Sequence, residues 1–511
     1  MGNIYLKFEE KAYMFKDKPA VVTQEESVTY KTLNDMISAT ALYYKELGFK
    51  KGDIICFICD NSINYIVCYL AACKNEICFV PIDSRLTGDD IYRISEIVKP
   101  IAVICENRFH DIGYKVLSSE GSKDIISKEK IFYRNKMDLI YYNDRISINP
   151  YLKEDDFTVL FSSGTTGGPK GVVFSQDIII NQIIISSKYF EMADSDRILC
   201  PVTLAHSYGI FDHALTSLMI GATLYLPNIG MMNPRLILDI IHEEKITFFG
   251  TLPYMYDMMA SIRTKKLYDF ASVRYMICGG APLLKETIDK FENRFGRKFN
   301  QVYGMTEVGY IAFNKELKDA NSIGKPFREL QLKIIDAEGK ECGSGELGEL
   351  IVKRDDMVSR GYLRNSEEQK AMYKDDWFYT KDIVRINEEG YLYYSGRISD
   401  FINIGGNKLN PADIEKVINE ITGVKESIAI GIENELGHQE IYVVVVPENI
   451  GNLEEFEKDV MYYCIKRLAA FKRPSRIKFI NELPKTPLGK IRKGELIEIL
   501  NKKQCELNIT I

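Results

Sequence analysis

Residues 161–173 read Phe161-Ser-Ser-Gly-Thr-Thr-Gly-Gly-Pro-Lys-Gly-Val-Val173, and the apolar run 158–161 leads into them. Glycines let a backbone turn tightly and bring its N–H groups close to a ligand. Hydroxyls and a lysine are suitable hydrogen-bond donors for phosphate oxygens. The stretch therefore predicts a phosphate-binding loop after a strand. The residues expected to bind phosphate are Ser162, Ser163, Gly164, Thr165, Thr166 and Lys170.

This loop differs from the Walker loop of other nucleotide-binding proteins. The Walker pattern G-x-x-x-x-G-K-[ST] would need glycine at Pro169 and a hydroxyl residue after Lys170, where the chain has Gly171. A kinase built on that loop is therefore the least favoured function. A plain surface loop is the alternative explanation for a stretch rich in glycine, serine and threonine, but segments later in the chain support the binding loop.

The segment from Ser162 to Gly171 resembles the signature loop of the adenylate-forming superfamily, which contains acyl-CoA synthetases, peptide-synthetase adenylation domains and luciferases. The resemblance runs from about Ser27 to the C-terminal region and so covers most of the chain. It implies an acyl-CoA synthetase-like ligase that uses ATP and Mg²⁺ to convert a fatty or aromatic carboxylic acid into acyl-AMP and pyrophosphate. The thiol of CoA then receives the acyl group.

Composition places the chain among ordinary soluble proteins. Its 511 residues suffice for two to four domains of ~150 residues each. The net charge of −6 gives no overall attraction to nucleic acid. We find no signal-peptide core and no apolar stretch of ~18 residues, so we expect a cytoplasmic protein without a membrane span. The C-x-x-C pair Cys56 and Cys59 lies in an apolar run, which favours buried thiols over the alternative of a zinc site.

The hydrophobic pattern alternates between helix and strand. Helical spacing covers 30–47, 61–74 and 89–98, and short apolar runs follow or precede these segments at 54–59, 77–81 and 101–105. Such alternation is typical of an α/β domain with a mostly parallel sheet. A second series of the same kind covers 178–303 and includes a helix expected at 211–219. Residues 107–149 are polar and weakly patterned.

The pattern changes after about Leu330. Short alternating runs separated by glycine turns predict a small antiparallel β unit, and residues after 399 predict a compact α+β unit. We therefore expect an α/β protein with two domains. Residues 1–398 form a large N-terminal domain of layered α/β subdomains plus the antiparallel unit, and 399–511 form a small mobile α+β domain. The boundary rests on the resemblance, which implies a hinge after Arg397.

A second motif, Gln301-Val-Tyr-Gly-Met-Thr-Glu307, follows an expected strand. The resemblance implies that its aromatic ring packs on adenine, that its hydroxyl contacts phosphate, and that Glu307 holds Mg²⁺ together with Thr165. A carboxylate is suitable because a hard cation prefers oxygen ligands. The other residues implied in nucleotide binding or catalysis here are Tyr303, Gly304, Met305 and Thr306. The loop Cys278-Gly-Gly-Ala-Pro282 resembles one that lines both adenine and the acyl pocket, through Gly280 and Ala281.

Further candidates lie in the last third of the chain. Asp382 and Arg397 resemble the residues that bind ribose, although Lys381 stands where the family has glycine. Lys490, in Pro484-Lys-Thr-Pro-Leu-Gly-Lys490, resembles the catalytic lysine of the superfamily. Transfer of AMP to a carboxylate needs no general base, because the nucleophile is already ionised; it needs positioning and relief of charge at phosphorus. For CoA, the resemblance implies Gly406 beside the thiol tunnel, and Lys472 offers charge for the phosphates.

The acid-binding side is less defined. Ala205-His-Ser-Tyr-Gly209 resembles the segment in which a histidine, here His206, gates the acyl pocket. Relatives that activate amino acids carry an aspartate for the α-amino group at the position of Tyr208, and Asp212 is out of register. Two alternatives stay open. In the first, the enzyme loads an acyl, aryl or amino acid onto the phosphopantetheine thiol of an acyl carrier protein instead of CoA. In the second, the chain binds nucleotide or acyl groups without turnover.

Overall fold

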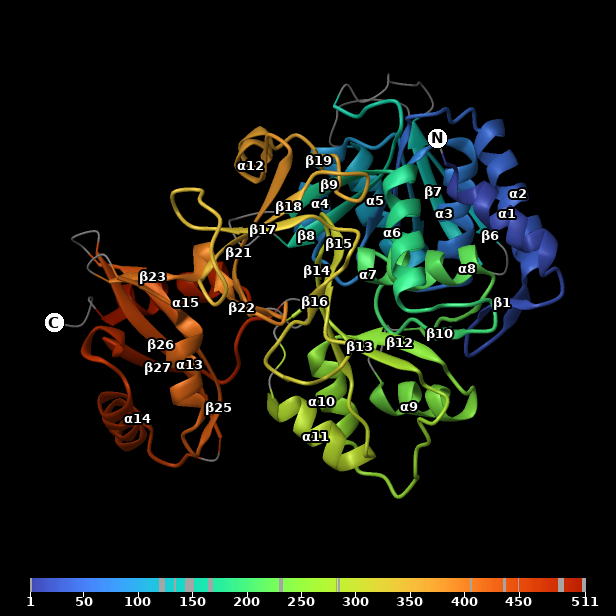
Figure 1. The fold of residues 1–511 in the computed structure, drawn as a ribbon. Coiled ribbons are helices and arrows are strands. Elements are labelled where there is room, and N and C mark those ends of the chain that lie inside the picture. The colour runs from blue at the N-terminus through green and yellow to red at the C-terminus, as the bar shows by residue number, and fades with distance from the viewer. Residues whose placement is uncertain are drawn as a thin grey trace. The chain divides into compact units, whose positions relative to one another are not determined.

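We describe a computed structural model of the chain (Figure 1). The structure describes residues 2–118, 125–132, 135–142, 151–163, 169–228, 233–281, 283, 285–404, 407–434, 438–448, 450–485 and 491–507. They form two compact units. The first contains the described residues up to 331 together with 353–378, and the second contains 332–352 and the residues from 379 onward. The predicted domain boundary after residue 398 stays a prediction.

The first unit contains a sheet whose centre is parallel, as the alternating pattern predicts. Its described strands are, in spatial order, β19 (Gly361–Tyr362), β9 (Pro169–Ser175), β8 (Asp156–Ser163), β4 (Cys78–Ile82), β3 (Ile54–Ile58), β5 (Ala102–Glu106), β7 (Asn135–Tyr142) and β6 (Ile125–Phe132). The helices that follow these strands or precede them are α2 (Tyr30–Glu46), α3 (Ile63–Asn75), α4 (Gly88–Val98), η1 (Asn107–Phe109) and α5 (His110–Ser118). Every residue of β3 and β4 is buried, so these strands read as continuous apolar runs.

A second sheet in the same unit carries the candidate site. Its described strands are, in spatial order, β16 (Lys325–Pro326), β15 (Gly309–Phe313), β14 (Asn300–Met305), β13 (Tyr275–Cys278), β12 (Phe248–Thr251), β10 (Arg197–Leu199), β11 (Thr223–Tyr225), β1 (Pro19–Val22) and β2 (Ser27–Thr29). The strands from β14 through β1 run parallel. In sheets of this kind, ligands bind outside the carboxyl ends of the strands, where β13 and β14 lead into the two predicted nucleotide motifs.

Helices cover both faces of this second sheet. They are α1 (Ile4–Met14), α6 (Gln176–Tyr189), α7 (Ser207–Gly209), α8 (Thr216–Ile220), α9 (Pro234–Glu243), α10 (Pro253–Ser261) and α11 (Lys285–Phe295). In Figure 1, α9, α10 and α11 lie below β12 and β13, whereas α6 and α8 lie above them. An apolar core that includes Leu238, Phe249, Tyr256 and Phe291 fills the layer between β12, β13 and the lower helices.

The expected helix at 211–219 differs from an ordinary α-helix. Its first part, Ile210–Leu215, is a π-helix (η2), and α8 continues it. Polar side chains bind main-chain carbonyls inside this turn: Nδ1 of His213 lies 2.6 Å from the carbonyl oxygen of Tyr208, and the Thr216 hydroxyl donates to that of Phe211 at 2.8 Å. These bonds support a wider turn. Single π-helical turns occur frequently at functional sites.

The second unit contains the predicted antiparallel strands and the predicted α+β fold. Antiparallel pairs join β17 (Leu332–Ile335) with β18 (Gly348–Lys353) and β21 (Trp377–Ile386) with β22 (Leu392–Arg397). The remaining elements are η3 (Ile398–Asp400), β23 (Ile402–Ile404), β24 (Asn407–Leu409), α13 (Pro411–Asn419), β25 (Val424–Glu433), β26 (Gln439–Pro447), α14 (Leu453–Arg467), η4 (Ala470–Lys472), β27 (Arg476–Phe479) and α15 (Lys493–Leu507). Two apolar clusters, one on each face of β25 and β26, form the core.

Two expectations from composition concern the thiols and the membrane. Cys56 and Cys59 are buried, as predicted. Within the described ranges, no group of three or more histidine, cysteine and acidic side chains is arranged to hold a metal ion. None of the described helices combines the length and the apolar character that a membrane crossing requires.

Candidate active site

The carboxylate of Glu307 is held by a hydrogen bond just beyond the carboxyl end of β14. Its side chain is buried, with 7% of the residue exposed. Oε1 accepts a hydrogen bond from the Tyr362 hydroxyl at 2.7 Å, and the main-chain oxygen accepts one from the Ser359 N–H at 2.7 Å. The Ser359 hydroxyl in turn lies 2.6 Å from that of Tyr373. These bonds position the negatively charged carboxylate of the predicted metal ligand.

The tyrosine that holds Glu307 also connects it to the predicted phosphate loop. Tyr362 lies on β19, which pairs antiparallel with β9 at Val172. β9 is the strand that leaves the loop, and Ser162 pairs with Lys170 where β8 and β9 meet. The structure therefore brings the loop's two strands and the carboxylate into one assembly. Gly164, Thr165 and Thr166 lie outside the described residues, as does the side chain of Ser163.

Burial raises the pKa of the Tyr362 phenol, and the negative charge of Glu307 raises it further. The phenol therefore stays protonated and donates to the carboxylate. Replacing Tyr362 by Phe should lower the free energy of unfolding by about 1.5–3 kcal/mol, because it removes a hydrogen bond to a charged group. Tyr373→Phe is the matched control, since it removes a bond to a neutral hydroxyl worth about 1 kcal/mol. Urea denaturation measures both, and equal losses would contradict the assignment.

Lys170 has a protein partner in this structure. Its ammonium lies 2.8 Å from Oε1 of Glu368, and each of the two side chains is 14% exposed. Glu368 lies on α12 (Ser366–Met372), which follows β19 and precedes β20 (Tyr373–Lys374). An ammonium has three N–H donors, so the ion pair orients Lys170 and leaves donors for a second acceptor. Whether that acceptor is phosphate stays a prediction.

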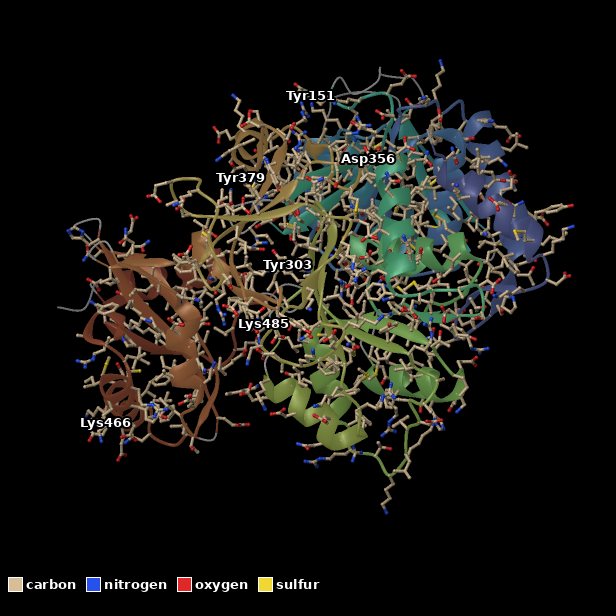
Figure 2. All side chains as sticks on the ribbon, in the orientation of Figure 1. Tyr151, Tyr303, Asp356, Tyr379, Lys466 and Lys485 are labelled. Carbon is tan, nitrogen blue, oxygen red and sulfur yellow. The ribbon has the colours of Figure 1, made fainter. Side chains whose placement is uncertain are left out.

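The predicted nucleotide strand and the glycine loop are shaped for close backbone approach. Tyr303, labelled in Figure 2, lies on β14 opposite Ala312 of β15. A Cβ atom at Gly304 would lie 2.4 Å from the carbonyl oxygen of Gly309, so only glycine fits between these strands. Gly280 has a φ of +78°, in the left-handed region that favours glycine. Met305, Thr306 and Ala281 are partly exposed beside these positions.

His206 lies beside an ion pair whose carboxylate is buried. Its Nε2 is 3.8 Å from Oδ2 of Asp83, whose two oxygens accept from the Arg85 guanidinium at 2.9 and 2.7 Å. Burial lowers the pKa of His206; the Asp83 carboxylate opposes this shift and the Arg85 guanidinium adds to it. Burial would raise the pKa of Asp83, but the bonds from Arg85 lower it more. His206 is therefore a neutral imidazole at pH 7 next to an ionised pair.

The second unit brings together the predicted ribose-binding pair. Asp382 on β21 and Arg397 on β22 are register partners, and Nε of Arg397 donates to Oδ1 of Asp382 at 3.0 Å. Asp382 is buried, with 3% of the residue exposed. The sequence predicted both residues as one pair, and their contact is present. Their role toward a ribose stays a prediction.

Comparison with known proteins assigns the family. A family model described as AMP-binding enzyme matches residues 8–363, which is more than half of the chain. The chain belongs to the family of AMP-binding enzymes. A second model, described as the C-terminal domain of AMP-binding enzymes, matches residues 413–490. The predicted membership of the adenylate-forming superfamily is therefore confirmed.

Similar proteins cover nearly the whole of this AMP-binding enzyme. An oxalate–CoA ligase from Arabidopsis thaliana is 26% identical over an alignment of 511 residues, gaps included. The alignment covers 95% of the chain and 96% of that protein. A long-chain-fatty-acid–CoA ligase from Mycobacterium tuberculosis is 27% identical over 92% of the chain and 93% of its own length. The structure of ATP-bound MatB from Rhodopseudomonas palustris superposes with a TM-score of 0.83 at 24% identity, covering 97% and 98% of the two chains. The predicted α/β fold, with a large N-terminal and a smaller C-terminal domain, is confirmed.

Three further predicted residues of this AMP-binding enzyme are Gly406, Lys472 and Lys490. Gly406 and Lys490 lie outside the described residues. Lys472 forms an ion pair with Asp413 at 2.7 Å, so its ammonium is already partly neutralised. Near the predicted hinge, Asp400 pairs with Lys493 at 2.9 Å.

Several residues of the site carry no recognisable motif. Asp83 and Arg85 follow β4, and a polar residue directly after a buried parallel strand is a signal that would have found Asp83. Tyr362 and Glu368 gave no such signal, because only the pairing of β19 with β9 brings their segment to the site. His213 was not selected among the five histidines.

Lys381, at the position where the resemblance implies glycine, has a φ of +58°, in the left-handed region that favours glycine. A side chain in this region costs roughly 1 kcal/mol. We expect Lys381→Gly to be neutral or to raise the free energy of unfolding by up to ~1 kcal/mol, and Lys381→Val to lower it by ~1–2 kcal/mol. Both variants lose the lysine side chain, so urea denaturation isolates the backbone effect. A more stable valine variant would contradict the left-handed turn.

Proposed function

We propose that this AMP-binding enzyme is an ATP-dependent carboxylate–CoA ligase. The observation that carries the proposal is the buried carboxylate of Glu307, which Tyr362 ties to the strand leaving the signature loop. A metal-binding carboxylate and a phosphate-binding loop in one assembly suit a reaction that handles a nucleotide triphosphate. The names of the similar proteins, oxalate–CoA ligase and long-chain-fatty-acid–CoA ligase, support a carboxylic acid and CoA as the other substrates.

The proposed reaction has two steps. An oxygen of the substrate carboxylate attacks the α-phosphorus of ATP, the bond to pyrophosphate breaks, and acyl-AMP forms. The sulfur of CoA then attacks the acyl carbon, the bond to AMP breaks, and the thiol proton is released. No residue needs to act as a base in the first step. The chain's task is to hold the reactants in line and to offset charge at phosphorus, which we assign to Lys490 and the signature loop.

Mg²⁺ is part of the proposal because the donor set suits it. Tyr362 donates to Oε1 of Glu307, and the carboxylate retains further lone pairs for a hard cation. Bound there, Mg²⁺ would supply positive charge for the phosphate oxygens. Glu307 would hold the ion, with Thr165 as the second predicted ligand.

AMP release from ATP and CoA, measured over short, long-chain and aryl carboxylic acids, tests the function. CoA-dependent AMP release with one class of acid would support the ligase and identify the acid. Acid-dependent exchange of pyrophosphate into ATP, without CoA-dependent turnover, would indicate that the acceptor is a carrier-protein thiol and not CoA. Neither exchange nor AMP release with any acid would contradict the proposal.

A further inference from the structure

A buried carboxyl group in the first unit lacks a partner in the described part of the chain. Asp212 lies on the π-helix η2 and is 8% exposed, so water still reaches part of it. Among the residues that the structure describes, no hydrogen bond or ion pair reaches its carboxyl group. Burial raises the pKa of Asp212 well above its usual value and so favours the neutral acid. Buried polar side chains nearly always have a partner, and an exception calls for an explanation.

Two phenols beside Asp212 have unused hydrogen-bonding capacity as well. The hydroxyl of Tyr310 is buried and has no hydrogen-bond partner within the described ranges. The hydroxyl of Tyr208 donates only at 3.5 Å, to the carbonyl oxygen of Ile277. The two rings meet edge to face with centroids 6.2 Å apart. Asp212 lies close enough to both hydroxyl groups that a charge on its carboxyl group would raise their pKa values. Three polar groups with spare capacity therefore lie in one place.

These groups belong to elements that carry or adjoin both parts of the predicted substrate site. Tyr208 follows the predicted acid-binding His206 by two residues, and its hydroxyl would be 2.3 Å from a Cβ atom at Gly250 on β12. Tyr310 on β15 is the register partner of Gly304 in the predicted nucleotide strand. The cluster thus connects the predicted acid-binding segment, through Tyr208, with the predicted nucleotide strand, through Tyr310.

The neighbouring histidine does not provide the missing partner. Nδ1 of His213 lies 2.6 Å from the carbonyl oxygen of Tyr208, and Nε2 accepts from the Gly250 N–H at 3.0 Å. Both ring nitrogens are therefore in use. Burial lowers the pKa of His213 to about 4, so the ring is neutral at pH 7 and offers no charge to Asp212.

We propose that Asp212, with the hydroxyls of Tyr208 and Tyr310, binds a hydrogen-bond donor on the substrate acid, either a hydroxyl or an amino group. The proposal rests on the ligase function proposed above and names the class of acid. A hydroxyl satisfies the neutral carboxyl group as a hydrogen-bonded partner. A protonated amine ionises Asp212 and forms a buried ion pair with it. The proposal does not place the donor on the α-carbon of the acid. It therefore agrees with the sequence, which has Tyr208 at the position where relatives that activate α-amino acids carry an aspartate.

Matched acids test this preference. Two series serve as probes: benzoate with its 3-hydroxy and 3-amino derivatives, and hexanoate with its 6-hydroxy and 6-amino derivatives. The kcat/KM of acid-dependent pyrophosphate exchange is measured for each acid. We expect the best substituted acid to exceed its parent by about 10- to 100-fold, because the parent leaves the buried polar groups unpaired. Equal values within both series would overturn the inference.

Two variants locate the preference at Asp212. Asp212→Leu should reduce the ratio of substituted to parent acid to about 1 or below, because the polar partner is gone. Its melting temperature should stay the same or rise, since no native bond is lost. Asp212→Asn, nearly isosteric, should keep a preference for hydroxyl but lose one for amine, which separates the two donors. A ratio unchanged in both variants would overturn the inference.

The stability and the activity of the protein separate the remaining outcomes. A lower melting temperature with equal loss for every acid would make Asp212 a structural residue and overturn the inference. If acids are activated without any preference for donors, this inference fails and the ligase function stands. If no acid in any series is activated, the ligase function fails and the inference fails with it.

Discussion

Replacing Glu307 by Gln should lower the kcat of acyl-AMP formation by about 100- to 1,000-fold, because the cation at the phosphates loses its fixed negative ligand. Glutamine keeps the size of the side chain and an oxygen that accepts from Tyr362 at the position now 2.7 Å away. The fold should therefore be preserved. Pyrophosphate exchange measured over a series of Mg²⁺ concentrations should show the loss, together with a higher Mg²⁺ requirement.

A surface acid of the same unit provides the control for this experiment. Glu316 pairs with Lys318 at 2.9 Å and its side chain is 50% exposed. Glu316→Gln removes the same charge far from any predicted ligand, and we expect the exchange rate to stay within two-fold of the original, on the order of what surface substitutions cause. If Glu307→Gln behaves like this control, then Glu307 does not hold the metal ion.

Replacing Lys490 by Ala should lower the rate of acyl-AMP formation by about 100- to 1,000-fold, as the loss of one positive donor at the transition state would. The second step does not build charge at phosphorus, so thioester formation from supplied acyl-AMP should be spared. Single-turnover measurements of the two half-reactions separate the effects. Equal loss in both would contradict the assignment of Lys490.

The neighbouring Lys485 is the matched control for Lys490. It lies in the same motif but pairs with Glu426 at 2.5 Å, and Lys485→Ala should change either half-reaction by less than about three-fold, since exposed ion pairs contribute ~0–1 kcal/mol. A third variant, Lys490→Arg, retains the positive charge and should recover part of the first step. These comparisons distinguish loss of charge from disturbance of the segment.

The elements that the sequence predicted well are those with continuous burial. The helix expected at 30–47 is α2 (Tyr30–Glu46), and the strand expected at 54–59 is β3 (Ile54–Ile58). In both, the hydrophobic pattern matches the buried residues directly, because one stripe of α2 and both faces of β3 are covered.

The segment 107–149 shows where this reasoning is insufficient. It contains α5 and the antiparallel strands β6 and β7, which lie at the edge of their sheet. The described side chains of β7, residues 137–141, are all buried, and the polar Asp138 among them interrupts the apolar pattern. An edge strand takes its structure from its neighbour more than from its own periodicity. The π-helix η2 was missed because its side-chain bonds to carbonyls leave no trace in hydrophobic spacing.

The same distinction applies to the candidate site. Glu307, Asp382 and Arg397 belong to local motifs, so their residue types and spacing were sufficient to select them. Asp83 and Tyr362 act through partners more than 50 positions away in the chain, His206 and Glu307 respectively. Such contacts arise from sheet topology, which a single sequence does not specify at the level of one side chain. Asp212 was visible in the sequence, but its lack of a partner was not.

The pairing of β19 with β9 also has a consequence for how the protein is made. Without β19, the outer edge of β9 is an open row of hydrogen-bonding groups beside the buried Val172 and Val173. Such an edge is a template for pairing with another chain. At about 5–20 residues per second, a ribosome needs roughly 10–40 s to travel from Lys170 to Tyr362. During synthesis, the edge of the strand that leaves the signature loop is therefore exposed for that interval. A chaperone that binds exposed strand edges would protect β9 until β19 is made.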